Sequence, residues 1–127
     1  MELKYKKVIS EELETLERSL ALSVSSEIEL ATEVSNYLVN SGGKRIRPAI
    51  CILVAKAFGY SGDDLIRLAS SIELLHTATL IHDDVVDESQ MRRGKESIQK
   101  KWDNAHGVLV GDFVYSKAFQ LMASFDN

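Results

Sequence analysis

The 127-residue chain has one proline, one cysteine and no long hydrophobic run. A single cysteine, Cys51, excludes an intrachain disulfide, and its place in the apolar run 49–55 is typical of a buried thiol in a reducing compartment. The longest apolar run is far shorter than the ~20 residues that span a bilayer. Lys4, Lys6 and Lys7 lead into acidic residues and not into the apolar stretch of a secretory signal. We therefore expect a cytoplasmic protein.

The chain also lacks a strong excess of either charge, since its net charge is −4. This balance gives no general attraction to nucleic acid, so each basic cluster has to be interpreted locally. Hydrophobic residues make up 45% of the chain and charged residues 27%, a composition that argues against intrinsic disorder. The length is sufficient for one domain with a modest core.

Alternating strand patterns are rare, and apolar residues recur at helical spacing almost throughout. They predict an all-α antiparallel bundle of about five helices, which cover residues 9–20, 26–41, 48–58, 63–87 and 105–123. The second helix should begin at Ser26, with Glu29 completing a capping box, and carry Leu30 inward. The third should begin at Pro48, and its apolar character on almost every side favours a central position. Residues 88–105 are predicted to form a polar connection.

Three carboxylates crowd the end of the fourth predicted helix, at Asp83, Asp84 and Asp87. Asp83 and Asp87 are one helical turn apart, so their Cβ atoms lie roughly 6 Å apart on one face. Like charges at this spacing repel, and a divalent cation between them removes the repulsion. Carboxylate oxygens suit Mg²⁺, which usually shares its coordination shell with water and substrate phosphates. The pair predicts a magnesium site and a diphosphate or nucleotide substrate.

Two further features could contact such a substrate. His76 lies about two turns before Asp83 on the same helix face, where both a structural role and contact with substrate are open. The segment 42–47 combines two glycines with the cations Lys44 and Arg47 ahead of a helix start. Lys44 supplies a point charge and Arg47 a planar fork, which favours phosphate binding over a solvated basic turn. The spacing of a P-loop is absent.

A second basic cluster, Arg92 and Arg93, follows the aspartates within residues 91–94. Alone it would be an exposed basic turn. At the exit of a metal-binding helix it can bring two guanidinium groups to the same phosphates. Because the two arginines diverge in direction, they can serve two separate anions. This arrangement predicts two phosphorylated substrates.

Taken in order, these segments resemble the trans-type isoprenyl diphosphate synthases. The matching blocks are GGKRIRP at 42–48, ELLHT at 73–77, LIHDDVVD at 80–87, MRRG at 91–94 and LVGDF at 109–113. A lone Asp-Asp-x-x-Asp motif is weak evidence because terpene cyclases share it, whereas these blocks in this order are specific. The resemblance covers nearly the whole chain. It implies an all-α bundle of the isoprenoid synthase type around a deep central cavity, usually a homodimer.

The resemblance also implies the reaction, a head-to-tail condensation of an allylic diphosphate with isopentenyl diphosphate. By similarity, Asp83 and Asp87 bind Mg²⁺ that bridges the allylic diphosphate, and Asp84 supports them. Arg92 would hold the allylic diphosphate, and Lys44 counts with Asp83 and Asp87 among the catalytic residues. Four residues would hold isopentenyl diphosphate: Lys44, Arg47, His76 and Arg93. Stabilisation of charge on the leaving diphosphate is the main catalytic effect, and no protein nucleophile is required.

Product length should depend on the wall that the growing isoprenoid tail follows. Residues one to two turns before Asp83 are expected to line it, namely Ala78, Thr79 and Leu75. By the resemblance, short-chain members carry bulky aromatic residues at the position of Ala78. The small Ala78 predicts an open tunnel and a long product of the octaprenyl kind, made for quinone side chains and delivered to a membrane. Alternatively, Ala78 only permits close helix packing.

The sequence departs from the family in one respect, because it has no second aspartate-rich motif. We therefore expect residues 1–127 to be the N-terminal part of a single isoprenoid synthase domain, inactive alone, with the C-terminal half absent. Two alternatives are a helical subunit or interaction domain that assists a catalytic partner, and a terpene cyclase fragment. Intact Asp83 and Arg92 argue against a non-catalytic subunit. Lys44 and Arg47 argue against a cyclase, which needs no second diphosphate pocket.

Overall fold

The computed structural model describes residues 4–40 and 43–125, and these form an all-α fold with one small hairpin. The helices are α1 (Lys4–Val8), α2 (Ser10–Ser23), α3 (Glu29–Asn40), α4 (Ile46–Ala57), α5 (Asp63–Val86), α6 (Ile98–Lys101) and α7 (Asn104–Ala123). The strands are β1 (Met91–Arg92) and β2 (Lys95–Glu96). The five longer helices correspond to the five predicted ones, and the short α1 and α6 are additions.

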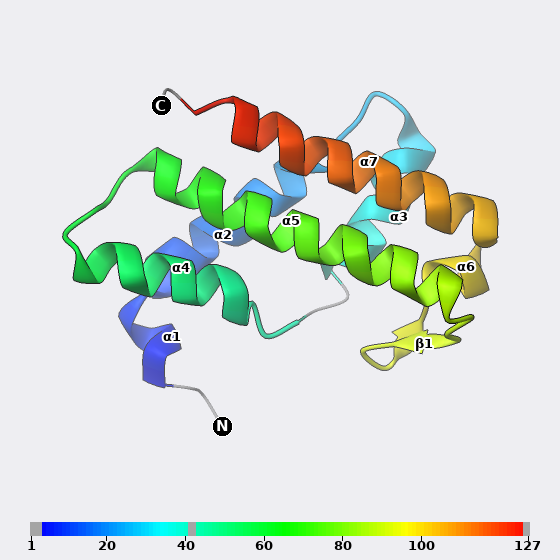
Figure 1. The fold of residues 1–127 in the computed structure, drawn as a ribbon, viewed down its shortest axis with the longest axis horizontal. Helices are drawn as coiled ribbons and strands as arrows, with labels where there is room; N and C mark the ends of the chain where they lie inside the picture. The colour runs from blue at the N-terminus through cyan, green and yellow to red at the C-terminus, as the bar shows by residue number, and fades with distance from the viewer. Residues whose placement is uncertain (1–3, 41–42, 126–127) are drawn as a thin grey trace.

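Helix α5 is the centre of the molecule (Figure 1). It has 24 residues, so it is about 36 Å long at 1.5 Å per residue. Helix α7 packs antiparallel along one side of α5, while α4 and α2 also pack against it. Of the helices in the part of the chain that the structure describes, none is long and apolar enough to cross a membrane.

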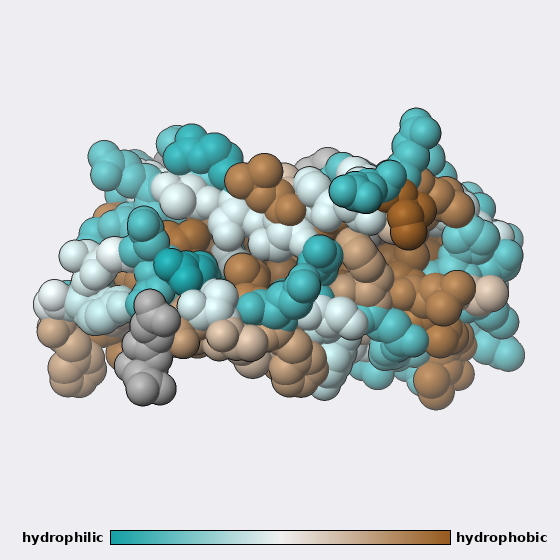
Figure 2. Space-filling model, turned by 90° about the horizontal axis from the view of Figure 1, so that it is seen from above, coloured by the Kyte–Doolittle hydropathy of each residue, from teal (hydrophilic) through white to brown (hydrophobic). Residues whose placement is uncertain are grey.

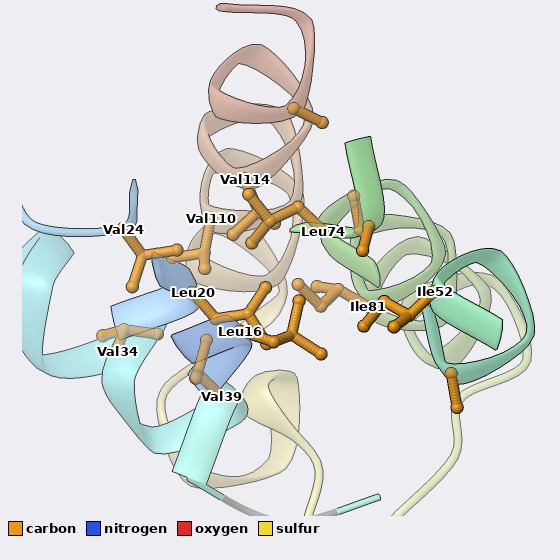
Figure 3. Packing of buried hydrophobic residues seen from close by; sticks show 14 of the residues in the cluster. Leu16, Leu20, Val24, Val34, Val39, Ile52, Leu74, Ile81, Val110 and Val114 are labelled. Carbon is orange, nitrogen blue, oxygen red and sulfur yellow. The ribbon is translucent and has the colours of Figure 1, made fainter. Parts of the chain in front are cut away.

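The core lies where α2, α3, α5 and α7 meet (Figure 3). Leu16 and Leu20 of α2 are fully buried together with Ile9, so these residues form the apolar face of the helix predicted over residues 9–20. They meet Leu74 of α5 and Val114 of α7 in one continuous cluster. Burying a side chain of this size contributes about 1.5–3 kcal/mol, so this cluster is the main source of stability.

Two glycines allow α7 to approach α5 closely. A Cβ atom at Gly111 would lie 2.2 Å from the His82 Nε2, and one at Gly107 would lie 2.6 Å from the Val85 Cγ2. The bare backbone of α7 therefore receives side chains of α5 directly.

Two predicted helix starts are wrong. Helix α3 begins at Glu29, because the Ser26 Oγ accepts a hydrogen bond from the Ile28 N–H and the Ser26 N–H donates to the Thr32 Oγ1. These bonds form a turn before the helix instead of a capping box. Helix α4 begins two residues before Pro48, since Arg45 caps it in the left-handed conformation.

The predicted central position of α4 is also wrong for this chain. One face packs on α5 through Ala49 and Ile52, and the opposite face is open to solvent. Four apolar side chains at four-residue spacing form this exposed face: Ile46, Ile50, Val54 and Phe58. Leu30 of α3, predicted to point inward, is also exposed. Cys51 is only half-buried, and its burial raises the pKa of the thiol.

The predicted polar connection contains a hairpin and α6. Strand β1 pairs antiparallel with β2, with Arg92 opposite Lys95. Arg93 and Gly94 join the strands and both have positive φ, 52° and 78°. This is the pattern of a two-residue type I′ turn, which matches the twist of the flanking strands. As a result, Arg92 lies on a strand and Arg93 in the turn, so their backbones are oriented differently.

Candidate functional site

A pocket of about 600 Å³ opens where the loop before α4 meets α5 and the hairpin. Its lining comes from Gly43–Arg47, from Glu73 and His76 of α5, and from Arg93 of the hairpin. The structure thus brings together all four residues that the family resemblance assigns to one diphosphate: Lys44, Arg47, His76 and Arg93. Three cations and an imidazole around one cavity are chemically suited to an anion, which stays a prediction for these four residues.

Glycine is required at position 43 by this geometry. Gly43 has φ of 134°, and a Cβ atom there would lie 2.8 Å from the Arg93 Cζ. The guanidinium of Arg93 therefore packs on bare backbone. Burial lowers the pKa of Arg93, and the charges of Arg45 and Arg92 lower it further. Gly42, the first glycine of the motif, lies outside the described residues.

His76 is held as a neutral imidazole in the pocket. The Arg47 Nη1 lies 3.2 Å from the His76 Nε2, and a guanidinium can only donate, so Nε2 accepts this hydrogen bond. Burial lowers the pKa of His76, and the charge of Arg47 lowers it further. A bound anion would compensate these positive charges and favour the protonated ring. His76 can therefore gain a proton as the pocket fills.

This coupling predicts pH-dependent anion binding. We expect sulfate, which does not titrate in this range, to bind about tenfold more tightly at pH 5.5 than at pH 7.5, because the bound anion raises a pKa that is lowered in the free pocket. Calorimetric titration at both pH values measures this change. His76→Gln should remove it, whereas His106→Gln, outside the pocket, should not. Equal affinity at both pH values would separate His76 from anion binding.

In the protein without a bound anion, the lowered pKa of His76 makes the native state less stable as pH falls. Without an anion, the unfolded chain binds more protons than the native chain as pH falls below about 6.5. The contribution of His76 to stability is therefore complete above that value and is lost as pH falls through the lowered native pKa.

The three aspartates of the motif have different environments. Asp83 and Asp87 are exposed, whereas Asp84 is 4% exposed and faces the hairpin. The Arg92 Nε donates to the Asp84 Oδ2 at 3.1 Å, and the Arg92 Nη2 donates to the Asp84 Oδ1 at 2.5 Å. These hydrogen bonds raise the pKa of Arg92. Asp84 therefore anchors Arg92, and its predicted support of Asp83 and Asp87 stays a prediction.

The exposed pair fits a shared magnesium ion in the chemistry of its donors. Asp83 and Asp87 offer hard carboxylate oxygens from adjacent turns of one helix end, and Mg²⁺ typically takes one or two carboxylates plus water and phosphates. Among the residues that the structure describes, no group of three or more His, Cys, Asp or Glu is arranged to hold a metal. A magnesium ion held by this pair would take its remaining ligands from water or phosphate oxygens.

The structure does not place Ala78 on an open wall. Its side chain is 0% exposed and belongs to the core. This burial is compatible with the alternative interpretation, close helix packing, and the effect of Ala78 on product length stays a prediction. Thr79 is exposed and its Oγ1 donates to the His76 carbonyl oxygen at 2.6 Å, while Leu75 is half-buried. Of the three predicted wall residues, Thr79 is the one with an open surface.

Sequence reasoning missed two charged residues of the pocket, Arg45 and Glu73. Glu73 is 3% exposed and lies on the buried face of α5, one turn from Ala69 and one from Thr77. A carboxylate on an otherwise buried helix face signals a buried cationic partner. The partner is Arg45, whose Nη1 donates to the Glu73 Oε1 at 2.8 Å. The pairing could not be assigned from spacing, because the residues lie on different elements.

The fold and the site define a class of protein, namely an all-α protein with a cavity lined by basic side chains and a pair of exposed carboxylates at the end of its long central helix. Residues 28–127 match the family model described as polyprenyl synthetase, so the chain belongs to this family. It is 45% identical over 121 residues to octaprenyl diphosphate synthase of Escherichia coli K12, which covers 95% of this chain and 38% of that protein. The predicted family and the predicted all-α fold of the isoprenoid synthase type are confirmed.

Solved structures agree with this assignment. A decaprenyl diphosphate synthase from Rhodobacter capsulatus matches with a TM-score of 0.91 and 39% identity, over 98% of this chain and 38% of that one. A polyprenyl synthase from Caulobacter crescentus, complexed with calcium and isoprenyl diphosphate, matches with a TM-score of 0.90 and 37% identity, over 94% and 36%. The chain therefore spans less than two fifths of the length of these relatives.

Proposed function

We propose that this chain is the N-terminal part of a Mg²⁺-dependent trans-polyprenyl diphosphate synthase and supplies its isopentenyl diphosphate pocket. The observation that carries this proposal is the meeting of Lys44, Arg47, His76 and Arg93 around one cavity. The Caulobacter relative, whose complex contains a divalent cation and an isoprenyl diphosphate, supports it. The octaprenyl and decaprenyl relatives favour a long-chain product.

Within this function, the basic residues of the pocket and the exposed aspartates have separate tasks. Lys44 and Arg47 bind phosphate oxygens of isopentenyl diphosphate, and His76 adds a donor when it is protonated. Asp83 and Asp87 would hold Mg²⁺, which when bound supplies neutralisation of the charge on the leaving allylic diphosphate. Fixed charges placed beforehand cost no reorganisation during the reaction, so catalysis here is mainly electrostatic.

The same proposal extends to assembly and product. The exposed apolar residues of α7 offer a surface for a homodimer, and Figure 2 shows hydrophobic areas on the face seen from above. These residues are Val108, Leu109, Tyr115 and Phe119. We further propose that the enzyme is cytoplasmic. Its long polyprenyl diphosphate product would be delivered to a membrane for quinone synthesis.

Binding of isopentenyl diphosphate tests the pocket directly. We expect Arg47→Ala to weaken binding about tenfold or more, because it removes a charge-assisted fork to the phosphates. The measurement is isothermal titration of the purified chain. Lys100→Ala, which removes one exposed positive charge outside the pocket, should leave the affinity nearly unchanged.

A different result favours the interaction-domain alternative. If isopentenyl diphosphate neither binds in the calorimeter nor raises the thermal midpoint, the pocket is only a solvated basic surface, because a ligand of the native state must stabilise it. Equal weakening by Arg47→Ala and Lys100→Ala would show attraction by net charge without a defined site.

A further inference from the structure

Arg45 lies between the two cations of the pocket loop, yet its guanidinium is directed to the helices. It is 9% exposed and makes four hydrogen bonds. The Nε and Nη2 atoms donate to the Glu17 carboxylate of α2 at 2.7 and 3.2 Å. The Nη1 donates to Glu73 of α5, and the Nη2 also donates to the Val39 carbonyl oxygen of α3, both at 2.8 Å. One side chain thus ties three helices to the loop.

The backbone of Arg45 depends on these bonds. Its φ is 53°, a left-handed conformation that costs a residue with a Cβ atom about 1–2 kcal/mol. Such a conformation persists when tertiary contacts over-determine it. Arg45 is also the N-cap of α4, and its carbonyl oxygen accepts a hydrogen bond from the Ala49 N–H. The anchoring of Arg45 therefore sets the positions of Lys44 before it and Arg47 after it.

Arg45 also neutralises the negative charge of Glu73 in the pocket wall. Glu73 lines the pocket with almost no exposed surface, and an unpaired carboxylate there would repel an anion. Burial acts to lower the pKa of Arg45, but hydrogen bonds and charges from Glu17 and Glu73 outweigh it and raise the pKa. The guanidinium stays charged and pairs with Glu73.

We propose that Arg45 is the positioning residue of the anion pocket: the brace formed by Glu17, Arg45 and Glu73 fixes Lys44 and Arg47 on the rim, while Arg45 itself does not bind the anion. The proposal rests on the proposed function, because it concerns the same pocket. It assigns a role in binding to Glu17, a residue that does not line the cavity.

Glu17 gives a sharper test than Arg45. A change at Arg45 also removes a positive charge near the anion, so weaker binding would be ambiguous. Glu17→Ala removes a negative charge, and electrostatics alone predicts tighter anion binding. The brace predicts the opposite sign. Because Glu17 is 48% exposed and Arg45 keeps Glu73 and Val39, this variant should fold.

The experiment is a titration of the chain with inorganic pyrophosphate. We expect Glu17→Ala to weaken binding about tenfold, the scale of an outer residue that orients a binding group. Glu14→Ala, an exposed carboxylate three residues earlier on α2, should leave binding unchanged or slightly tighter. Thermal unfolding of each variant confirms that the native state is populated during the titration.

The outcomes separate the two proposals. Unchanged or tighter binding by Glu17→Ala, with normal binding by the unmodified chain, overturns the brace and leaves the anion pocket in place. If the unmodified chain does not bind pyrophosphate or isopentenyl diphosphate, both the pocket and the brace are refuted. In the Arg45→Lys background, Glu17→Ala should have little further effect, and a full additional tenfold loss would show that Glu17 acts without Arg45.

Discussion

Asp83→Asn and Asp84→Asn are expected to differ strongly in their effect on stability, although the two residues are adjacent and chemically identical. Asp84→Asn should lower the free energy of unfolding by about 2 kcal/mol, because it breaks a bidentate pair with Arg92 and leaves a half-buried guanidinium without its carboxylate. Asp83→Asn should change it by less than about 0.5 kcal/mol, since Asp83 is exposed and loses both its repulsion with Asp87 and its attraction to Arg92. Urea unfolding of the two variants measures the difference.

For Mg²⁺-dependent binding, Asp83→Asn should be the more harmful of the two changes. Asp83→Asn removes a predicted Mg²⁺ ligand, so the increase in pyrophosphate affinity that Mg²⁺ causes should disappear. Asp84→Asn keeps Asp83 and Asp87, so this increase should largely persist at a temperature where the variant is folded. If both variants lose stability equally, or both keep the Mg²⁺ effect, the separate roles assigned to these aspartates are incorrect.

The difference between Asp83 and Asp84 shows what the sequence can and cannot provide. Helical periodicity places the exposed pair on one face and Asp84 on another, which is a local property of the chain. The periodicity also predicted the helix over residues 9–20, which contains the buried Leu16 and Leu20. It could not identify Arg92 as the partner of Asp84, because that contact depends on the type I′ turn that folds the hairpin back.

Non-local contacts explain the other corrections. The apolar residues on the exposed face of α4 led to the prediction of a central helix. The sequence pattern alone does not distinguish an apolar residue that is packed from one that is exposed. In the sequence, Arg45 is one of several cations in a basic loop. In the structure, its guanidinium donates hydrogen bonds to Glu17 and Glu73 on two other helices and is buried between them. The roles assigned to Lys44, His76 and the other site residues stay predictions until binding is measured.

The packing of α7 on α5 leads to the second large effect. Gly111→Ala should lower the free energy of unfolding by about 1–3 kcal/mol, the usual cost of overpacking a close contact. In a solvent-exposed helix, Gly→Ala raises the free energy of unfolding by about 1 kcal/mol. The sign of the measured change therefore shows whether the contact with His82 or the helix propensity dominates. The new Cβ atom would lie 2.2 Å from the ring of His82. That ring cannot move freely, because its Nε2 lies 3.2 Å from the Val108 carbonyl oxygen and 3.3 Å from the Asp112 carboxylate.

A double-mutant cycle separates the clash from helix propensity. In the His82→Ala background the ring is gone, so Gly111→Ala should become neutral or stabilising by about 1 kcal/mol. The two changes should therefore couple by more than about 1 kcal/mol in urea unfolding. Additive effects would mean that α7 shifts away from α5 without cost. Because Val85 faces Gly107 in the same register, such a shift would also make Gly107→Ala harmless, and the close contact between the two helices would then have no energetic importance.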